Sequence, residues 1–124
     1  MDKLIINFTE TTPQVNFDPG LGLLAIEGRV IPEDVGSFFS PIFYWIEKFE
    51  PDVNKPYVLR FCLFYYNTSS SKRIFEVMKR FDEKFQNGGN IKIRWEYEDG
   101  DDDTFQDGED YKKMLKIPFE IIKV

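Results

Sequence analysis

The sequence contains no histidine and only one cysteine, Cys62, among its 124 residues. Histidine is the commonest general base and the commonest transition-metal ligand, so its absence argues against many enzymatic and metal-dependent activities. A single cysteine allows neither an internal disulfide nor a zinc cluster. Because Cys62 lies in an apolar, strand-like run, we expect a buried core thiol, and a lone cysteine fits a reducing compartment.

The chain is also short of positive charge and of long hydrophobic runs. With 16 basic and 22 acidic residues, its net charge is −6. Nucleic acid and anionic lipid would repel such a chain, so we expect neither as a partner. No stretch is long and apolar enough to span a bilayer, and the N-terminus lacks a signal region. We therefore expect a cytoplasmic protein.

Aromatic residues, by contrast, are abundant. They make up 17% of the sequence, with thirteen Phe, and 42% of all residues are hydrophobic. This supplies a dense core, which argues against a disordered chain. The length suits a single domain over residues 1–124.

Hydrophobic periodicity predicts an α/β fold with a single mixed β-sheet of about six strands. Three strands form an N-terminal antiparallel meander, and from the third strand on the chain continues as β-α-β-α-β-α-β with parallel pairing. The expected strands cover residues 3–8, 12–17, 22–27, 57–66, 91–97 and 117–122. The expected helices cover 35–49, a segment from near Ser70 to a stop at 87–90, and 105–115.

Single residues refine this prediction. The nearly continuous apolar run Tyr57–Tyr66 predicts a central strand covered on both faces. Pro41 should kink or break the first helix, and Pro118 favours the start of a strand or an edge strand. Trp45 and Trp95 lie in helix and strand patterns, where core packing explains them best.

An acidic segment invites a calcium-binding hypothesis. Its carboxylates match ligand positions 1, 3, 5, 9 and 12 of an EF-hand loop: Asp99, Asp101, Asp103, Asp107 and Asp110. However, Thr104 replaces the required glycine, the last ligand is Asp rather than Glu, and a strand precedes the loop. The simpler interpretation is a solvated loop that starts a helix with Asp102 or Asp103 as its cap.

The run Asn67-Thr68-Ser69-Ser70-Ser71 places four hydroxyls where a strand pattern changes to a helix pattern. Free N–H groups and the helix dipole favour negative charge at such a point. Thr68 or a neighbouring serine could simply cap the helix, or a hydroxyl could accept a phosphate. Serine hydrolysis is disfavoured, since no histidine can activate these hydroxyls.

Several short motifs, in order and spacing, resemble the SiaC family of bacterial phosphoproteins that regulate biofilm formation and aggregation. The resemblance covers nearly the whole chain. Its landmarks are Thr12-Pro13, Ile31-Pro32-Glu33, Trp45-Ile46-Glu47-Lys48-Phe49, Tyr66-Asn67-Thr68-Ser69-Ser70, Trp95-Glu96-Tyr97 and Pro118-Phe119-Glu120-Ile121.

The resemblance implies a fold similar to the STAS domain of anti-sigma-factor antagonists. It also implies that Thr68 is the phosphoacceptor, with Asn67, Ser69 and Ser70 as motif neighbours. Ser71 is an additional hydroxyl, so Ser69, Ser70 and Ser71 remain secondary candidates. A dedicated kinase and a metal-dependent phosphatase would act on this site. The unphosphorylated form would bind and activate a diguanylate cyclase, raising cyclic di-GMP.

We therefore expect a non-enzymatic binding protein, without a cofactor, that is switched by phosphorylation. Lys72 and Arg73, one turn on, could partly offset a phosphate on Thr68, and the surface around the second helix would meet the partner. One alternative is a partner-switching anti-sigma-factor antagonist on the same fold. A further alternative is a cation-binding or small enzymatic domain that uses the acidic loop at residues 99–110.

Overall fold

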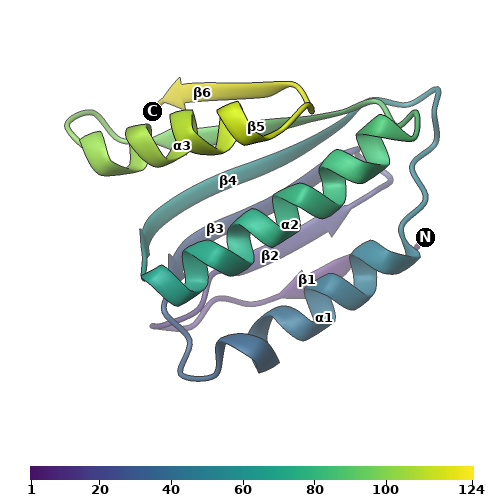
Figure 1. Ribbon diagram of the computed structural model, residues 1–124. Coiled ribbons are helices and arrows are strands. Elements are labelled where there is room, and N and C mark those ends of the chain that lie inside the picture. The colour runs from purple at the N-terminus through teal and green to yellow at the C-terminus, as the bar shows by residue number, and fades with distance from the viewer.

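The computed structural model describes residues 1–124 as one six-stranded sheet with three helices (Figure 1). The strands are β1 (Leu4–Ile6), β2 (Gln14–Asp18), β3 (Leu23–Val30), β4 (Tyr57–Tyr66), β5 (Ile91–Tyr97) and β6 (Phe119–Lys123). The helices are α1 (Val35–Lys48), α2 (Thr68–Gln86) and α3 (Asp102–Met114). None of them has the length and apolarity that crossing a bilayer requires.

The strands lie side by side in chain order, from β1 to β6. The pairs β1–β2 and β2–β3 are antiparallel, and β3 to β6 pair in parallel. The predicted mixed sheet is therefore confirmed. Pro118 directly precedes β6, which forms one edge of the sheet, as its lack of an N–H group favours.

All three helices cover the same face of the sheet (Figure 1). Each strand after β3 is added at the same edge, so each connecting helix returns over the same side. Burial consequently alternates along β4: Leu59, Phe61 and Leu63 are buried, whereas Val58 and Cys62 are only half-buried. The predicted central position of β4 is confirmed, but its predicted cover on both faces is wrong. Val58 and Cys62 face away from the helices, and their apolar character hid the alternation.

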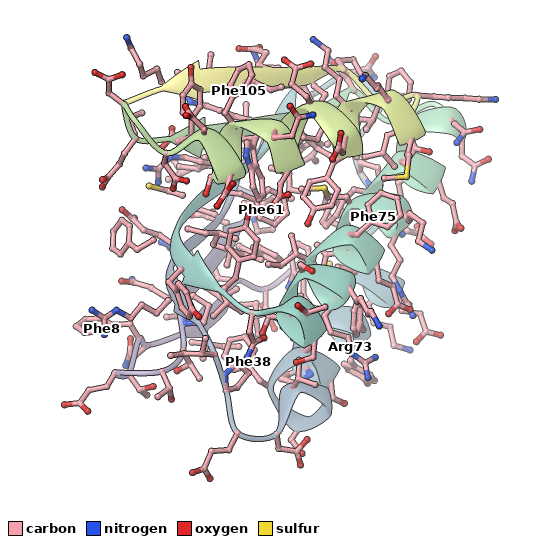
Figure 2. All side chains as sticks on the ribbon, turned by 60° about the vertical axis from the view of Figure 1, so that its left-hand side comes forward. Phe8, Phe38, Phe61, Arg73, Phe75 and Phe105 are labelled. Atoms are coloured by element: carbon pink, nitrogen blue, oxygen red, sulfur yellow. The ribbon has the colours of Figure 1, made fainter.

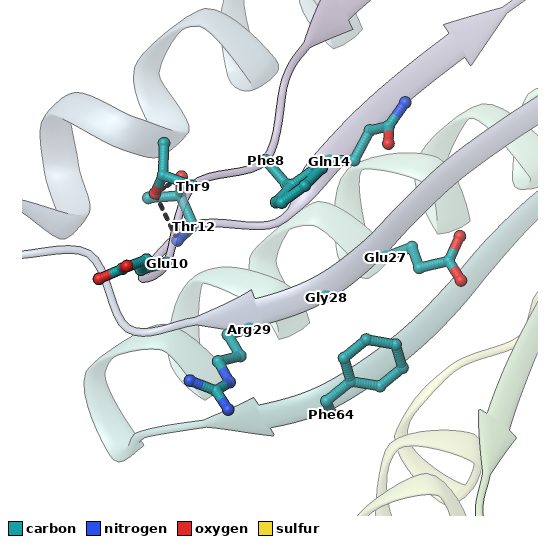
Figure 3. Close-up of a pocket in the computed structure, with 9 residues that line it drawn as sticks. All are labelled: Phe8, Thr9, Glu10, Thr12, Gln14, Glu27, Gly28, Arg29 and Phe64. Atoms are coloured by element: carbon teal, nitrogen blue, oxygen red, sulfur yellow. Dashed lines mark hydrogen bonds between the residues drawn. The ribbon is translucent and has the colours of Figure 1, made fainter.

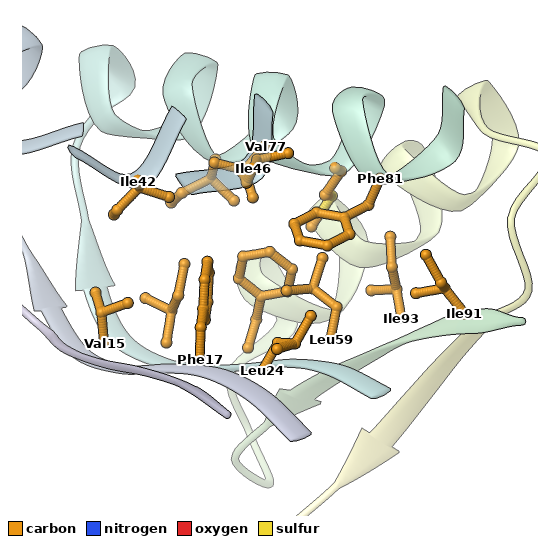
Figure 4. Close-up of a cluster of buried hydrophobic side chains, with 14 of the residues drawn as sticks. Val15, Phe17, Leu24, Ile42, Ile46, Leu59, Val77, Phe81, Ile91 and Ile93 are labelled. Carbon is orange, nitrogen blue, oxygen red and sulfur yellow. The ribbon is translucent and has the colours of Figure 1, made fainter. Parts of the chain in front are cut away.

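The core lies between the sheet and the helical layer. It is one cluster of 24 buried hydrophobic residues. Figure 4 shows Phe17, Leu24 and Leu59 rising from the sheet towards Ile46 of α1 and Phe81 of α2. Trp45 and Trp95 belong to the same cluster, as predicted.

The first helix covers the predicted segment within one residue, and Pro41 lies inside it. Asp34 caps it by accepting a hydrogen bond from the Ser37 N–H, and that bond holds the pKa of Asp34 below its usual value. The helix continues through Pro41 to Lys48, so of the two effects predicted for Pro41, a kink or a break, the break is wrong. Packing of Phe39, with Ile42, Trp45 and Ile46, into the core outweighs the hydrogen bond that a proline cannot donate.

The third helix packs against Trp95 of β5. The indole N–H donates to the carbonyl oxygen of Thr104 at 2.9 Å, and Trp95 is 1% exposed. Gly108 lies over the indole ring so closely that a Cβ there would sit 2.5 Å from Cδ1 of Trp95. The fit therefore requires glycine at this helical position.

The other face of the sheet carries charged side chains that pair with one another. Glu96 is 5% exposed and accepts hydrogen bonds from Arg60, at 2.9 Å to each carboxylate oxygen, and from Arg94 at 2.7 Å. Burial alone would raise the pKa of Glu96, but the two guanidinium groups outweigh it and hold that pKa below its usual value. Arg60 also meets Glu27 of β3 at 3.5 Å. We call this surface the open face.

Cys62 lies on the open face beside these charges, so the prediction of a fully buried core thiol is wrong. Partial burial raises its pKa to about 11, and the neighbouring Glu96 adds to the effect. The thiol is therefore exposed enough to be reached, yet it remains protonated at neutral pH.

Gly108→Ala should destabilise the protein by about 1–3 kcal/mol, because the added methyl group overlaps a fixed indole ring. Helix propensity alone predicts the opposite, a gain of about 1 kcal/mol. The matched control is Gly36→Ala in α1, where the nearest atom to a Cβ, Oδ1 of Asp34, is 3.6 Å away. Urea denaturation should show a loss for Gly108→Ala and no loss for Gly36→Ala. Equal stability of the two variants would contradict the close packing.

Cys62 should react slowly with Ellman's reagent in the folded protein. With a pKa of about 11, its thiolate fraction at pH 8 is roughly 100-fold below that of an ordinary thiol. The rate should rise with pH up to that value, and the urea-unfolded chain should react at the ordinary rate. Equal rates in the two states at pH 8 would refute the raised pKa.

Candidate functional site

An irregularity in β4 shapes the end of the sheet next to the hydroxyl run. Leu63 pairs with Gly28 of β3 and Tyr65 pairs with Arg29, so Phe64 has no partner across the ladder. Such a bulge shifts the alternation of side chains by one residue. Tyr66 therefore turns towards the helices and packs on Trp95, with ring centroids 6.0 Å apart, while Phe64 and Tyr65 are exposed.

Asn67, the residue after β4, caps α2. Its Oδ1 accepts a hydrogen bond from the Ser70 N–H at 2.9 Å and another from the Ser69 hydroxyl at 3.2 Å. The helix then begins at Thr68. The prediction that Thr68 or a serine acts as the cap is therefore wrong, and the start near Ser70 lies two residues too late. The predicted junction of strand, hydroxyl run and helix is confirmed.

The four hydroxyls differ in exposure. Thr68 and Ser69 are exposed, Ser71 is half-buried and Ser70 is 0% exposed. Ser71 donates its hydroxyl to the Thr68 carbonyl at 2.8 Å, and Ser69 donates to Asn67. The Ser70 hydroxyl is buried without a partner, so it is inaccessible in the folded protein. Thr68 alone combines an exposed side chain with a hydroxyl free of hydrogen bonds within the protein.

Positive charge lies one turn into α2. Lys72 is exposed and forms no ion pair, whereas Arg73 is half-buried and meets Glu76 at 3.8 Å. Lys72 is therefore the more available cation of the predicted pair. The first turn of α2 contains no acidic residue, so its free N–H groups and dipole favour an anion at Thr68.

Next to the hydroxyl run, Tyr66 connects the end of β4 to α3 through a hydrogen bond. Its hydroxyl donates to Oδ2 of Asp107 at 2.5 Å. Burial, followed by this carboxylate, raises the pKa of Tyr66 well above its usual value, so the group stays a donor at all physiological pH values. Tyr111 of α3, whose pKa burial raises to about 12, stacks on Phe75 of α2 with centroids 5.5 Å apart. These two contacts thus hold the end of β4 and the first half of α2 against α3.

The carboxylates of the acidic segment make separate local contacts in and around α3. Asp101 caps the helix by accepting from the Thr104 N–H at 3.1 Å, so the predicted cap at Asp102 or Asp103 is wrong by one or two residues. The remaining EF-hand candidates do not converge: Asp99 lies outside the helix, Asp103 is in its first turn, Asp107 holds Tyr66 and Asp110 pairs with Gln106. No group of three or more acidic or cysteine side chains in the molecule could hold a metal ion.

The open face contains a pocket of about 680 Å³ that sequence reasoning missed. It lies where β2, β3 and β4 meet the loop after β1, and Phe8, Arg29 and Phe64 are among its lining residues (Figure 3). One signal was available in the run Phe64-Tyr65-Tyr66, since three consecutive aromatic side chains of a strand cannot all face one core.

Comparison with known proteins gives the same fold over the whole chain. The structure titled SiaC of Pseudomonas aeruginosa superimposes with a TM-score of 0.88 at 29% identity, covering 100% of both chains. A chain in the crystal structure of diguanylate cyclase SiaD in complex with its activator SiaC, from the same organism, matches with a TM-score of 0.89 at 29% identity. That match covers 98% of this chain and 99% of the other.

Sequence comparisons agree. The protein PA14_02130 of Pseudomonas aeruginosa (strain UCBPP-PA14) is 30% identical over 121 residues, which is 98% of this chain and 96% of that protein. The model of the SiaC family, described as regulatory phosphoproteins, matches residues 6–124. Fold and sequence together define a regulatory phosphoprotein. The chain belongs to the SiaC family, which confirms the resemblance inferred from its motifs.

Asn67→Ala should destabilise the protein by about 1–2 kcal/mol, because it removes the acceptor of the Ser70 N–H at a buried position. Asn67→Asp is the matched control, since its carboxylate can accept the same bond and suits a helix start. Urea denaturation followed by circular dichroism measures both variants. If Asn67→Ala unfolds at the wild-type midpoint, the cap does not stabilise α2.

Proposed function

We propose that this protein is switched by reversible phosphorylation of Thr68, and that its unphosphorylated form binds and activates a diguanylate cyclase. The observation that carries the proposal is the difference among the four hydroxyls. Thr68 is exposed and free, at the first residue of α2, whereas its neighbours are hydrogen-bonded or buried. Membership of a family of regulatory phosphoproteins supports a phosphorylated residue somewhere in the chain.

The partner follows from the similar structures. SiaC, which shares this fold over its length, is described as the activator of the diguanylate cyclase SiaD. We extend that role to this chain. In this proposal a kinase adds the phosphate, a metal-dependent phosphatase removes it and the cyclase makes cyclic di-GMP in the cytoplasm. In this proposal the chain is a single regulatory domain that binds the cyclase and catalyses no reaction itself.

The local chemistry explains how the fold can carry the phosphate. Phosphorylation adds about 1.5 to 2 negative charges. At Thr68 these charges would meet the N–H groups of the first turn of α2 and the free cation of Lys72. Since nothing buried has to move, the expected effect is on the surface around the start of α2. There a partner would have to remove water from a dianion.

Thr68→Ala and Thr68→Asp should differ in partner binding. Used as affinity baits in lysate of the source organism, the Ala form should recover a diguanylate cyclase, and the Asp form should recover at least several-fold less. The purified cyclase should make cyclic di-GMP faster with the Ala form. Ser69→Ala, which alters the adjacent exposed hydroxyl, is the matched control and should behave as wild type.

Two results would contradict the proposal. Recovery of a regulator of a sigma factor would instead favour the anti-sigma-factor antagonist. Equal recovery of the cyclase with the Ala and Asp forms would show that charge at residue 68 does not control the complex. Mass spectrometry of phosphopeptides from native cells should locate the phosphate on Thr68 rather than on residues 69–71.

A further inference from the structure

The bulge in β4 produces an exposed aromatic surface on the side of the sheet that the helices leave uncovered. Phe64 is 59% exposed and Tyr65 is 57% exposed, although both belong to a central strand. Phe8, in the loop after β1, is 70% exposed. Phe8 and Phe64 both line the pocket of about 680 Å³ (Figure 3). Large aromatic side chains that flank a pocket on a surface are typical anchors of protein interfaces.

The pocket also contains a cation without a partner. On the open face Arg60 and Arg94 are paired with Glu96, and Lys92 is paired with Glu120. Arg29 is exposed and forms no ion pair, in a chain with an excess of acidic residues. Its backbone pairs with Tyr65, which places it directly across from the bulge.

The two carboxylates of the pocket do not neutralise Arg29. Glu27 is held by Arg60 at 3.5 Å, and Glu10 is exposed without an ion pair. Figure 3 shows the Glu10 carboxylate directed away from the rings of Phe8 and Phe64. A partner that matches this pocket would therefore place an apolar side chain between the two rings and a carboxylate beside it that reaches Arg29.

The pocket lies close in the chain to the proposed phosphoacceptor, because both are reached along β4. Phe64 precedes Thr68 by four residues, and β4 runs from the bulge directly into the Asn67 cap. Figure 2 shows Phe8 and Arg73 on opposite sides of the sheet. Thr68, the first residue of α2, follows β4 with only Asn67 between, so it lies where the chain passes from the sheet to the helical layer, which we call the rim. A partner seated in the pocket and reaching over this rim would cover Thr68.

We infer that the diguanylate cyclase of the proposed function anchors in this pocket, by an apolar side chain between Phe8 and Phe64 and a carboxylate on Arg29. The inference rests on the proposed function and specifies where the partner is held. A partner that touched only the outer side of α2 would leave the two exposed rings and the free guanidinium without a role. A partner that spans the rim uses all of them and is sensitive to charge at Thr68.

Isothermal titration with the purified cyclase that the Thr68→Ala bait recovers tests the inference. Phe64→Ala and Arg29→Glu should each weaken binding by about tenfold or more, and Arg29→Lys should retain most of it. The matched control is Tyr44→Ala, which removes an aromatic side chain of similar exposure, 65%, from α1. It should bind as wild type. Circular dichroism should show unchanged folding, since all three positions are exposed.

The outcomes separate this inference from the proposed function. If Phe64→Ala and Arg29→Glu bind like wild type while Thr68→Asp does not, the pocket is not the anchor and the switch stands. If Phe64→Ala abolishes self-association in analytical ultracentrifugation but leaves cyclase binding intact, the occupant is a second copy of the chain, and the inference is overturned. If Thr68→Ala recovers no cyclase, the proposed function fails, and this inference fails with it.

Discussion

Every feature of this molecule depends on the placement of all its helices on one face of the sheet. The spatial order of the strands follows the chain, so each crossover after β3 returns over the same side. One face then carries the apolar core, and the other must be stable in water without cover. Glu96, 5% exposed between Arg60 and Arg94, shows how this is achieved. Desolvating a carboxylate is costly, but charge-assisted hydrogen bonds from two guanidinium groups satisfy its oxygens, so the face stays ordered and polar.

The bulge at Phe64 changes which residues of β4 point towards the helices and which point towards the open face. Without the extra residue, Tyr66 would face away from the helices and could not reach Asp107 of α3. The same shift exposes Phe64 and Tyr65. The bulge thus allows Tyr66 to bond to α3 next to the hydroxyl run, and it also creates the exposed aromatic surface beside that run. A phosphate on Thr68 and a ligand on the open face would therefore act on neighbouring parts of a rigid framework.

The sequence predicted well what depends on local periodicity. The limits of β4 and β5 agree with the patterns, because the apolar run of β4, the glycine stop after α2 and the alternation along β5 are unambiguous. The cap of α2 was misplaced, since asparagine, serine and threonine have similar capping preferences, and only the backbone shows that Asn67 is extended. The bulge depends on how β4 pairs with β3, and the pocket joins Phe8, Arg29 and Phe64 from three segments. The run of three aromatic residues at the end of β4 indicates that not all of them face the core, but no local pattern shows which distant segments meet them.

Magnitudes indicate why a single phosphate at this rim suffices for the proposed switch. A hundredfold loss of affinity corresponds to about 2.7 kcal/mol. Desolvating an ion costs several kcal/mol, whereas a solvent-exposed ion pair such as one with Lys72 returns at most about 1 kcal/mol. Lys72 and the helix dipole can thus stabilise the phosphate in the free protein. They do not offset the free energy that a partner must spend to desolvate it in a complex. Since this penalty exceeds the required free energy, a partner that excludes water from Thr68 would bind the unphosphorylated form and not the phosphorylated one.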